Sequence, residues 1–151
     1  MELYVLFEKS TVTRVTFSGV IVLTIKTMKG NQLLVRKSYL FSLLIIELYK
    51  ILHYKHREDV MSKHILIKGT SIGSCLEVGQ DATSDEEQYV QLTIAYEYAR
   101  ETHYHIRLIR DSHLVDEEVS VVMLVECEEL MMMIKKLLQK MERTMPSCQW
   151  N

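Results

Sequence analysis

The chain has 151 residues, of which 48% are hydrophobic and 25% charged, and its net charge is −2. With one proline and five glycines, this composition is that of a globular protein and excludes a disordered or linker-rich chain. The small net charge excludes a global field that would attract nucleic acid or an anionic membrane.

The charge is divided unevenly along the chain. Residues 1–60 contain nine Lys/Arg and five Asp/Glu, whereas residues 61–151 contain nine and fifteen. This split would let the two halves attract each other, or let two copies pair head to tail, although summed charge says little about fold. The three cysteines lack CxxC spacing, which indicates neither a disulfide framework nor a zinc ribbon, so we expect a reducing cytoplasm.

Membrane and secretion signals are absent from the sequence pattern. The first residues do not have the order of a signal peptide, and the longest apolar run, residues 39–46, is too short to span a bilayer. We therefore expect no membrane partner.

The first half of the chain predicts strands followed by a helix. Residues 11–17 alternate and are rich in β-branched side chains, which is typical of a half-buried strand. Strands are also expected at residues 3–7, 20–27 and 32–36. Residues 40–52 then place their apolar side chains on one face at helical spacing. These apolar residues are Leu40, Phe41, Leu44, Ile45, Leu48, Ile51 and Leu52.

The second half predicts the same order. Strands are expected at residues 64–68, 89–98, 104–108 and 119–125, with a polar, glycine-containing loop over residues 69–87. The last helix has apolar residues from Leu130 to Met145 on one face and is expected to end at Pro146. The predicted fold class is α+β, with mainly antiparallel sheets, two amphipathic helices and the order ββββα-ββββα.

We take residues 1–151 as a single domain with two halves, 1–60 and 61–151. The segment Met61-Ser62-Lys63-His64 also looks like a natural protein start, so Met61 is an alternative start that would make the first 60 residues a translated leader. The clean apolar face of residues 40–52 argues for the full chain, because random coding seldom produces one over three turns.

Two patterns in the sequence are candidate ligand sites. On a strand, His103 and His105 would share one face, and with His113 across a turn they would form a metal site. The 69–79 loop contains two closely spaced glycines but lacks the Gly-Lys-Ser/Thr ending of a phosphate-binding loop. A solvated sheet face and a polar connection are the simpler interpretations. No catalytic triad can be assembled, so we expect neither an enzyme nor a cofactor.

The last helix carries more apolar side chains than one face can bury. Because residues 131 and 132 lie about 100° and 200° around the helix from residue 130, Met131 or Met132 is expected to remain exposed. Lys135 and Lys136 border this patch. A second copy of the chain is the simplest partner for it, which predicts a homodimer.

These observations rank three functions. The first is a non-enzymatic protein-binding or regulatory domain that associates with itself. The second is a small-molecule or metal-binding domain, or a hydrolase, that uses the 69–79 loop and the 103–113 histidines. The third is nucleic-acid binding through the basic first half; the acidic second half opposes it, so a nucleic-acid partner is the least expected.

Overall fold

The computed structural model describes residues 7–8, 11–12, 14–16, 19–21 and 30–144. Four long helices account for most of this range: α1 (Asn31–Lys50), α2 (Val60–Gln80), α3 (Asp85–Asp111) and α4 (Glu117–Thr144). A π-helical turn, η1 (Ile51–Lys55), continues α1. Short strands pair as two antiparallel hairpins, β1 (Phe7–Glu8) with β2 (Thr11–Val12) and β3 (Arg14–Thr16) with β4 (Gly19–Ile21).

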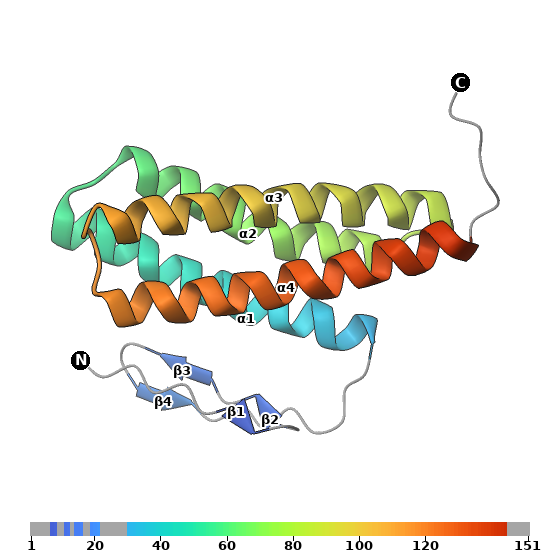
Figure 1. Ribbon diagram of the computed structural model, residues 1–151, viewed down its shortest axis with the longest axis horizontal. Coiled ribbons are helices and arrows are strands. Elements are labelled where there is room, and N and C mark those ends of the chain that lie inside the picture. Colours follow the sequence, from blue (N-terminus) through green and yellow to red (C-terminus); the bar gives the residue numbers. More distant parts are fainter. Residues whose placement is uncertain (1–6, 9–10, 13, 17–18, 22–29, 145–151) are drawn as a thin grey trace.

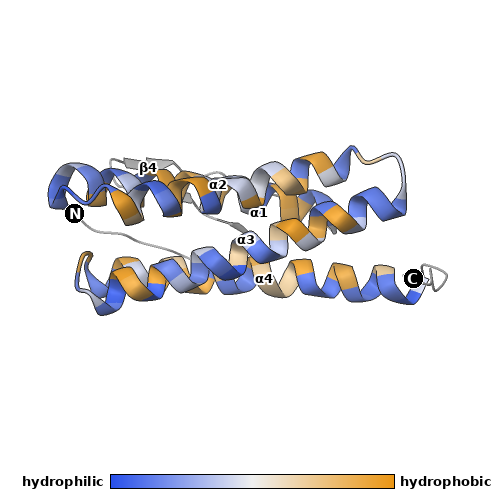
Figure 2. Cartoon of the chain, turned by 90° about the horizontal axis from the view of Figure 1, so that it is seen from above, coloured by the Kyte–Doolittle hydropathy of each residue, from blue (hydrophilic) through white to orange (hydrophobic). Residues whose placement is uncertain are grey.

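The four helices form an up-and-down bundle (Figure 1). Each helix packs against its neighbour in sequence, and α4 closes the bundle against α1 through a less extensive contact. Apolar residues recur along every helix with hydrophilic stretches between them, as Figure 2 shows, so each helix has an apolar side. These sides meet in one core that draws side chains from all four helices, including Ile45, Ile72, Ile106 and Ile134.

The predicted α+β fold is therefore wrong, because the segments expected as four sheet strands of the second half are helical. The buried positions of α2 include Ile65, Gly69, Ile72, Leu76 and Gly79, which follow one helix face at alternating spacings of four and three, together with Ser62 and Gly73. In α3 the buried positions are Leu92, Ala95, Ala99, Thr102, Ile106 and Ile109. Small residues occupy much of both buried faces, so the larger side chains suggested strand alternation instead.

Both predicted helices are present, and each begins earlier in the chain than expected. Residues 40–52 are helical as expected, within a helix that begins earlier, at residue 31, and so includes the expected strand 32–36. The last helix is also confirmed, and it begins at Glu117, so the expected strand 119–125 is its first part. Most of the expected strands 3–7 and 20–27, and Pro146, lie outside the described residues.

Glycines bring α2 close to α1. A Cβ atom added to Gly69 would lie 2.7 Å from Ile45 Cγ1, and one added to Gly73 would lie 3.1 Å from Ser42 Oγ. The 69–79 segment is therefore the middle and end of α2, not a loop, and its glycines allow two helices to pack closely. The expected polar loop over 69–87 is reduced to the short turn before α3.

A charged seam lies between α1 and α4. Lys37 is only 7% exposed and forms an ion pair with Glu129 across this seam. Burial raises the pKa of the neighbouring Glu126 carboxyl, although the Lys37 ammonium partly opposes that rise. Charges in this seam fit with its less extensive packing, because buried charges need partners that apolar side chains cannot provide.

None of the helices in the described ranges combines the length and the apolar character that a membrane span requires.

Candidate functional site

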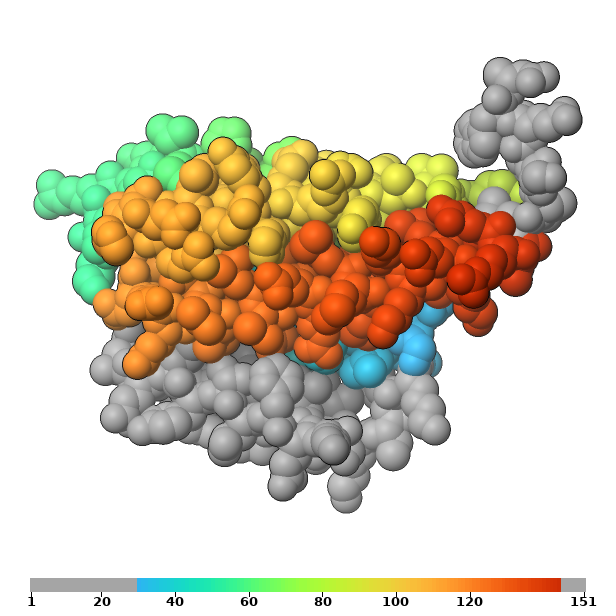
Figure 3. Space-filling view, viewed as in Figure 1, coloured from blue at the N-terminus to red at the C-terminus, as the bar shows by residue number. Residues whose placement is uncertain are grey.

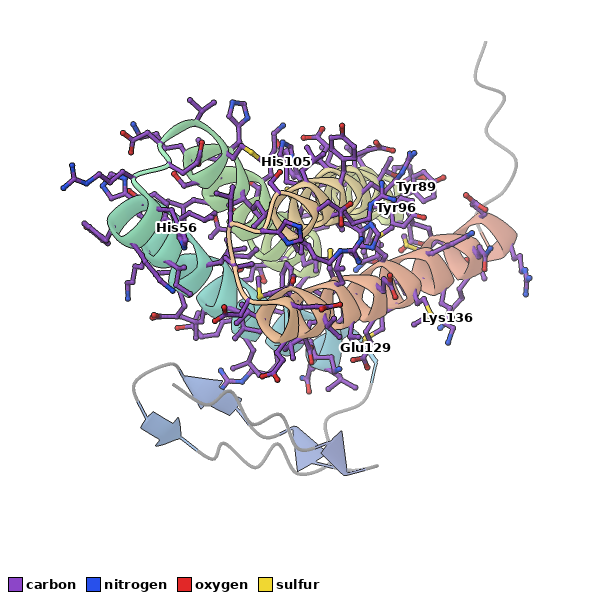
Figure 4. The ribbon with its side chains drawn as sticks, turned by 60° about the vertical axis from the view of Figure 1, so that its left-hand side comes forward. His56, Tyr89, Tyr96, His105, Glu129 and Lys136 are labelled. Carbon is purple, nitrogen blue, oxygen red and sulfur yellow. The ribbon has the colours of Figure 1, made fainter. Side chains whose placement is uncertain are left out.

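All six histidines of the chain lie in one half of the bundle, the half that contains the α1–α2 and α3–α4 turns. We call this half the histidine end. His53 and His56 lie in the α1–α2 turn region, His113 lies in the α3–α4 turn, and His64, His103 and His105 lie on the adjoining parts of α2 and α3. Figure 4 shows His56 and His105 in this half, whereas Lys136 projects from the distal part of α4.

The π-helical turn builds an aromatic stack at the histidine end. The rings of Tyr49 and His53 are parallel, with centroids 5.3 Å apart, and Tyr54 meets His53 edge-on at 4.7 Å. His53 is fixed further because its Nδ1 lies 2.6 Å from Asp59 Oδ1. The ring of Tyr54 is at the outer end of this stack, and the residue is 73% exposed.

Both acidic residues of the α1–α2 turn, Glu58 and Asp59, are bonded to nearby groups of the same region. The Glu58 carboxylate accepts hydrogen bonds from the backbone N–H groups of Val60, Met61 and Ser62 at 2.7–3.1 Å, and thereby caps the start of α2. Partial burial raises the pKa of the Glu58 carboxyl, but these backbone donors outweigh it and leave the pKa below its ordinary value. Asp59 is held by His53.

The cations of this turn consequently face solvent. Lys55, His56, Arg57 and Lys63 are exposed. Over residues 30–144, no carboxylate lies within ion-pair distance of Lys55, Arg57 or Lys63. Arg57 has a φ of 52°, the left-handed conformation that turns the chain from η1 into α2. We call Tyr54, Lys55, His56, Arg57 and Lys63 the basic turn.

The other turn at the histidine end is acidic. The α3–α4 turn and the first residues of α4 carry Asp111, Asp116, Glu117 and Glu118. Arg110 bonds to Asp111 at 2.8 Å, which leaves the rest as a negative surface. The histidine end is thus divided into a basic part on α1 and α2 and an acidic part on α4.

A shallow hollow on the outer side of α3 adjoins the basic part. Its volume is about 500 Å³, and it is lined by Glu97, Arg100, Glu101, His103, Tyr104, His105, Arg107 and Met131. His105 stacks on His64 of α2 with ring centroids 6.0 Å apart. Its Nδ1 lies 2.7 Å from the carbonyl oxygen of Glu101, and Lys68 pairs with the Glu101 carboxylate at 2.8 Å. The hollow therefore carries charges of both signs, most of them already paired.

The three residues of the predicted metal site are not brought together. On a helix, His103 and His105 point about 200° apart, so the expected shared face does not exist. His103 bonds to Glu128 of α4 at 3.0 Å, His105 faces α2, and His113 lies in the turn with a φ of 53°. In the part of the chain that the structure describes, no three His, Cys, Asp or Glu side chains are placed to hold a metal ion.

Three of the four residues of the predicted interface lie on the outer face of α4. Met132 is 56% exposed, and Lys135 and Lys136 are exposed beside it. Met131 is partly buried and packs against the core, so the excess apolar side chain expected on this helix is Met132. Val121 and Val125 extend the same face, and the full length of α4 is open to view from outside in Figure 3.

The cysteines of the described residues offer no reactive thiol. Burial raises the pKa of Cys127 to about 12, and its Sγ lies 3.4 Å from the carbonyl oxygen of Ala99 in the core. Burial also raises the pKa of Cys75. Thiols with raised pKa values are poor nucleophiles at neutral pH.

The family described as 23S rRNA-intervening sequence protein matches residues 31–136, the region from the start of α1 to the last part of α4. The chain belongs to this family. A search of curated proteins gives no match.

The fold of this chain is also seen in a solved structure. The crystal structure of a protein of unknown function from the S23 ribosomal protein family of Bacteroides thetaiotaomicron superposes with a TM-score of 0.70 at 29% sequence identity. The alignment covers 72% of this chain and 97% of that chain. The 23S rRNA-intervening sequence family is thus represented here by a helical bundle, and the basic turn lies inside the matched range.

Sequence reasoning missed most of the basic turn. The sequence pattern singles out neither Tyr54 nor the cations of residues 55–57, which belong to the basic first half of the chain. The available signal was the uninterrupted run of one aromatic and three basic residues between two apolar-patterned segments.

Proposed function

We propose that this protein binds RNA through the basic turn at its histidine end. The observation that carries the proposal is the segregation of charge there. Lys55, Arg57 and Lys63 are exposed without carboxylate partners in the described structure, because the two nearby acids, Glu58 and Asp59, are held by backbone N–H groups and by His53. Unpaired cations that contact phosphates displace the counterions condensed on the nucleic acid, and this release is a large source of binding affinity.

The net charge of −2 does not oppose this proposal. One group of acidic residues lies on the α2–α3 turn at the far end of the bundle, and the other, on the α3–α4 turn, borders the basic turn at the histidine end. Charges more than a Debye length away, about 8 Å at physiological salt, are largely screened from the basic turn. The proposed RNA surface is therefore limited to α1, η1 and the start of α2. The family name, which refers to 23S rRNA, also supports RNA as the partner.

The test is a binding titration of the full chain with fluorescently labelled RNA over a range of salt concentrations. Replacing Lys55, Arg57 and Lys63 together by alanine should weaken binding at least about tenfold and flatten the salt dependence by about two logarithmic units per decade, since each lost phosphate contact removes about 0.7.

The matched control replaces three basic residues at the far end of the bundle, Arg36, Lys140 and Arg143, by alanine. It makes the same change in net charge and should leave affinity within about twofold, because these side chains lie more than a Debye length from the basic turn. Equal losses in both triple variants would mean that binding follows net charge and not this site.

A second function, self-association, is supported by the outer face of α4. Val121, Val125 and Met132 are exposed along this face, with Glu117 and Glu118 before them and Lys135 and Lys136 after them. We call these seven residues the α4 stripe. If two copies of α4 pair antiparallel, Val121 lies opposite Met132 of the other copy, and Glu118 lies opposite Lys135. In this register Val125 lies opposite Glu128, whose carboxylate bonds to His103 of its own chain. The complementarity of the stripe is therefore in its two charged ends, as a two-fold interface allows.

Light scattering over a range of protein concentrations tests this second function. The wild-type chain should exceed its monomer mass of 17.7 kDa at high concentration. Met132→Lys should shift the equilibrium toward monomer, whereas Val90→Lys, which changes an exposed apolar residue on α3, should not. A monomer at every concentration would rule out the stripe as a self-association surface.

A further inference from the structure

We propose that the RNA bound at the basic turn is single-stranded and that one of its unpaired bases stacks on the ring of Tyr54. This inference rests on the proposed RNA-binding function and adds the class of RNA and the residue that selects it.

The first support is the position of Tyr54 itself. It is the most exposed of the large hydrophobic residues in the described structure, at 73%, and its ring is absent from the core. One edge contact, with His53, holds it from the protein side. Its outer surface is left open, and a planar base is the group that such a surface stacks best.

The second support is the way the stack is braced. Tyr54 rests on His53, His53 lies parallel to Tyr49, and Asp59 holds the imidazole of His53 at 2.6 Å. Tyr49 and His53 are four residues apart and so are neighbours along the helix, and the π-helical turn over Ile51–Lys55 carries both His53 and Tyr54. A braced aromatic ring loses little conformational freedom on binding, which favours affinity.

The third support is the arrangement of cations around the ring. Lys55 and Arg57 follow Tyr54 in the chain, and Lys63 lies one turn into α2. A base on Tyr54 would therefore have its flanking phosphates near unpaired ammonium and guanidinium groups. A combination of aromatic rings and basic side chains is the usual means of binding single strands without reading sequence.

The size of this end of the bundle argues against duplex RNA. Double-stranded RNA is recognised over roughly 16 base pairs, by surfaces that reach two successive minor grooves. The end of a four-helix bundle is only about two helix diameters wide, roughly 20 Å. The acidic α3–α4 turn occupies part of this end, so the basic surface is smaller than the full width of the bundle. Paired bases would also present no free face to Tyr54.

The experiment compares two probes on the full chain: a single-stranded RNA that contains one 2-aminopurine, and the same strand in a perfect duplex. Stacking on tyrosine should change the fluorescence of the single-stranded probe when protein is added. Tyr54→Ala should remove this change and weaken single-strand binding about ten- to a hundredfold, and Tyr54→Phe should remain within about twofold of wild type, because phenylalanine keeps the ring.

Tyr39→Ala is the matched control. Tyr39 is also an exposed tyrosine beside an arginine, with the Arg36 guanidinium 5.6 Å from its ring, but it lies near the start of α1, away from the histidine end. Its loss should not change binding. Circular dichroism of each variant verifies that the bundle is intact.

The outcomes separate this inference from the function on which it rests. If wild type binds neither probe, the RNA-binding proposal itself fails. If wild type binds RNA but prefers the duplex, or if Tyr54→Ala binds as tightly as wild type while the triple basic variant does not, RNA binding stands and stacking on Tyr54 is overturned.

Discussion

Single residues in α2 decide how closely two helices of the bundle approach. Gly69 faces Ile45, which is fully buried in the core, and Gly73 faces the backbone and hydroxyl of Ser38 together with Ser42. Glycine inside a helix normally lowers stability, so its presence at two positions one turn apart needs a local reason. Here that reason is steric, since a methyl group at residue 69 would overlap with the Ile45 side chain.

Gly69→Ala should therefore lower the free energy of unfolding, by roughly 1–3 kcal/mol, despite the better helix propensity of alanine. Urea unfolding monitored by circular dichroism measures this. Ser74→Ala, an exposed change on the same helix, should stay within about 0.5 kcal/mol of wild type. Ile45→Val should reduce the damage caused by Gly69→Ala, because it removes part of the overlapping side chain; additive losses in the double variant would contradict this explanation.

Glu58 gives the stability of the α1–α2 turn a defined pH dependence. Its pKa in the folded protein lies below the ordinary 4.5, because three backbone N–H groups bond to the carboxylate. A group whose pKa is lowered by folding stabilises the protein above its unfolded pKa, and this contribution is lost as the pH falls through the folded value. At neutral pH, Glu58→Ala should cost roughly 0.5–2 kcal/mol, as loss of a helix cap does.

The difference in unfolding free energy between wild type and Glu58→Ala should shrink as the pH is lowered below 4.5, and unfolding curves at several pH values would reveal it. Glu77→Ala, which removes an exposed carboxylate near the end of the same helix, should not lower stability at any pH. A constant difference for Glu58→Ala would show that the lost side chain matters for packing and not for its charge.

At the scale of elements, the sequence predicts the helices whose buried faces consist of large aliphatic side chains. Residues 40–52 and the last helix are of this kind. It fails for α3, whose buried face includes Ala95, Ala99 and Thr102 while Val90 and Ile94 are exposed. A prediction based on large apolar residues therefore counts exposed side chains of α3 as buried, and their alternation along the sequence suggests strands.

A helix-start signal in front of α3 was nevertheless present. Ser84 accepts a hydrogen bond from the backbone N–H of Glu87 at 3.1 Å, and the Glu87 carboxylate accepts one from the N–H of Thr83 at 3.0 Å. A Ser followed three residues later by Glu is typical of a helix N-terminus. The sequence pattern instead predicts this segment as part of a polar loop over residues 69–87. The basic turn is not predicted for a related reason, because it lies at a helix junction that the predicted sheet fold does not contain.

The two faces of α4 should respond oppositely to truncation. Ile134→Ala should cost roughly 2–5 kcal/mol, because Ile134 is fully buried in the core. Val125→Ala should cost less than about 0.5 kcal/mol in the monomer, because Val125 is exposed. Thermal unfolding at low protein concentration measures both. Similar losses in the two variants would mean that the α4 stripe is covered within a single chain.

At the scale of the whole molecule, the distribution of charge matters more than its sum. The first 60 residues are basic and the remainder acidic, yet the bundle places one basic and one acidic turn side by side at the histidine end. The sequence makes nucleic acid the least expected partner because the charge of the acidic second half is counted against that of the basic first half. Only the fold reveals that Glu58 and Asp59 are held within the turn, so that the neighbouring cations remain unpaired.

The same segregation along α4 predicts that self-association depends on charge order. The stripe begins with Glu117 and Glu118 and ends with Lys135 and Lys136, so an antiparallel pair of copies places opposite charges together at both ends. Replacing both lysines by glutamate should weaken association, because each end then brings like charges together. In this variant, Glu117→Lys with Glu118→Lys should restore association, since the order of charges along α4 is then reversed and the two copies are complementary again.

Sedimentation at several concentrations measures both variants. Because each exposed pair contributes only about 0.2–1 kcal/mol, the effects should be a few-fold and should fade at high salt. Restoration is the decisive result: weakening in both variants would place the contact elsewhere on the bundle, whereas rescue by the reversed charges requires that the two ends of α4 meet across a two-fold axis.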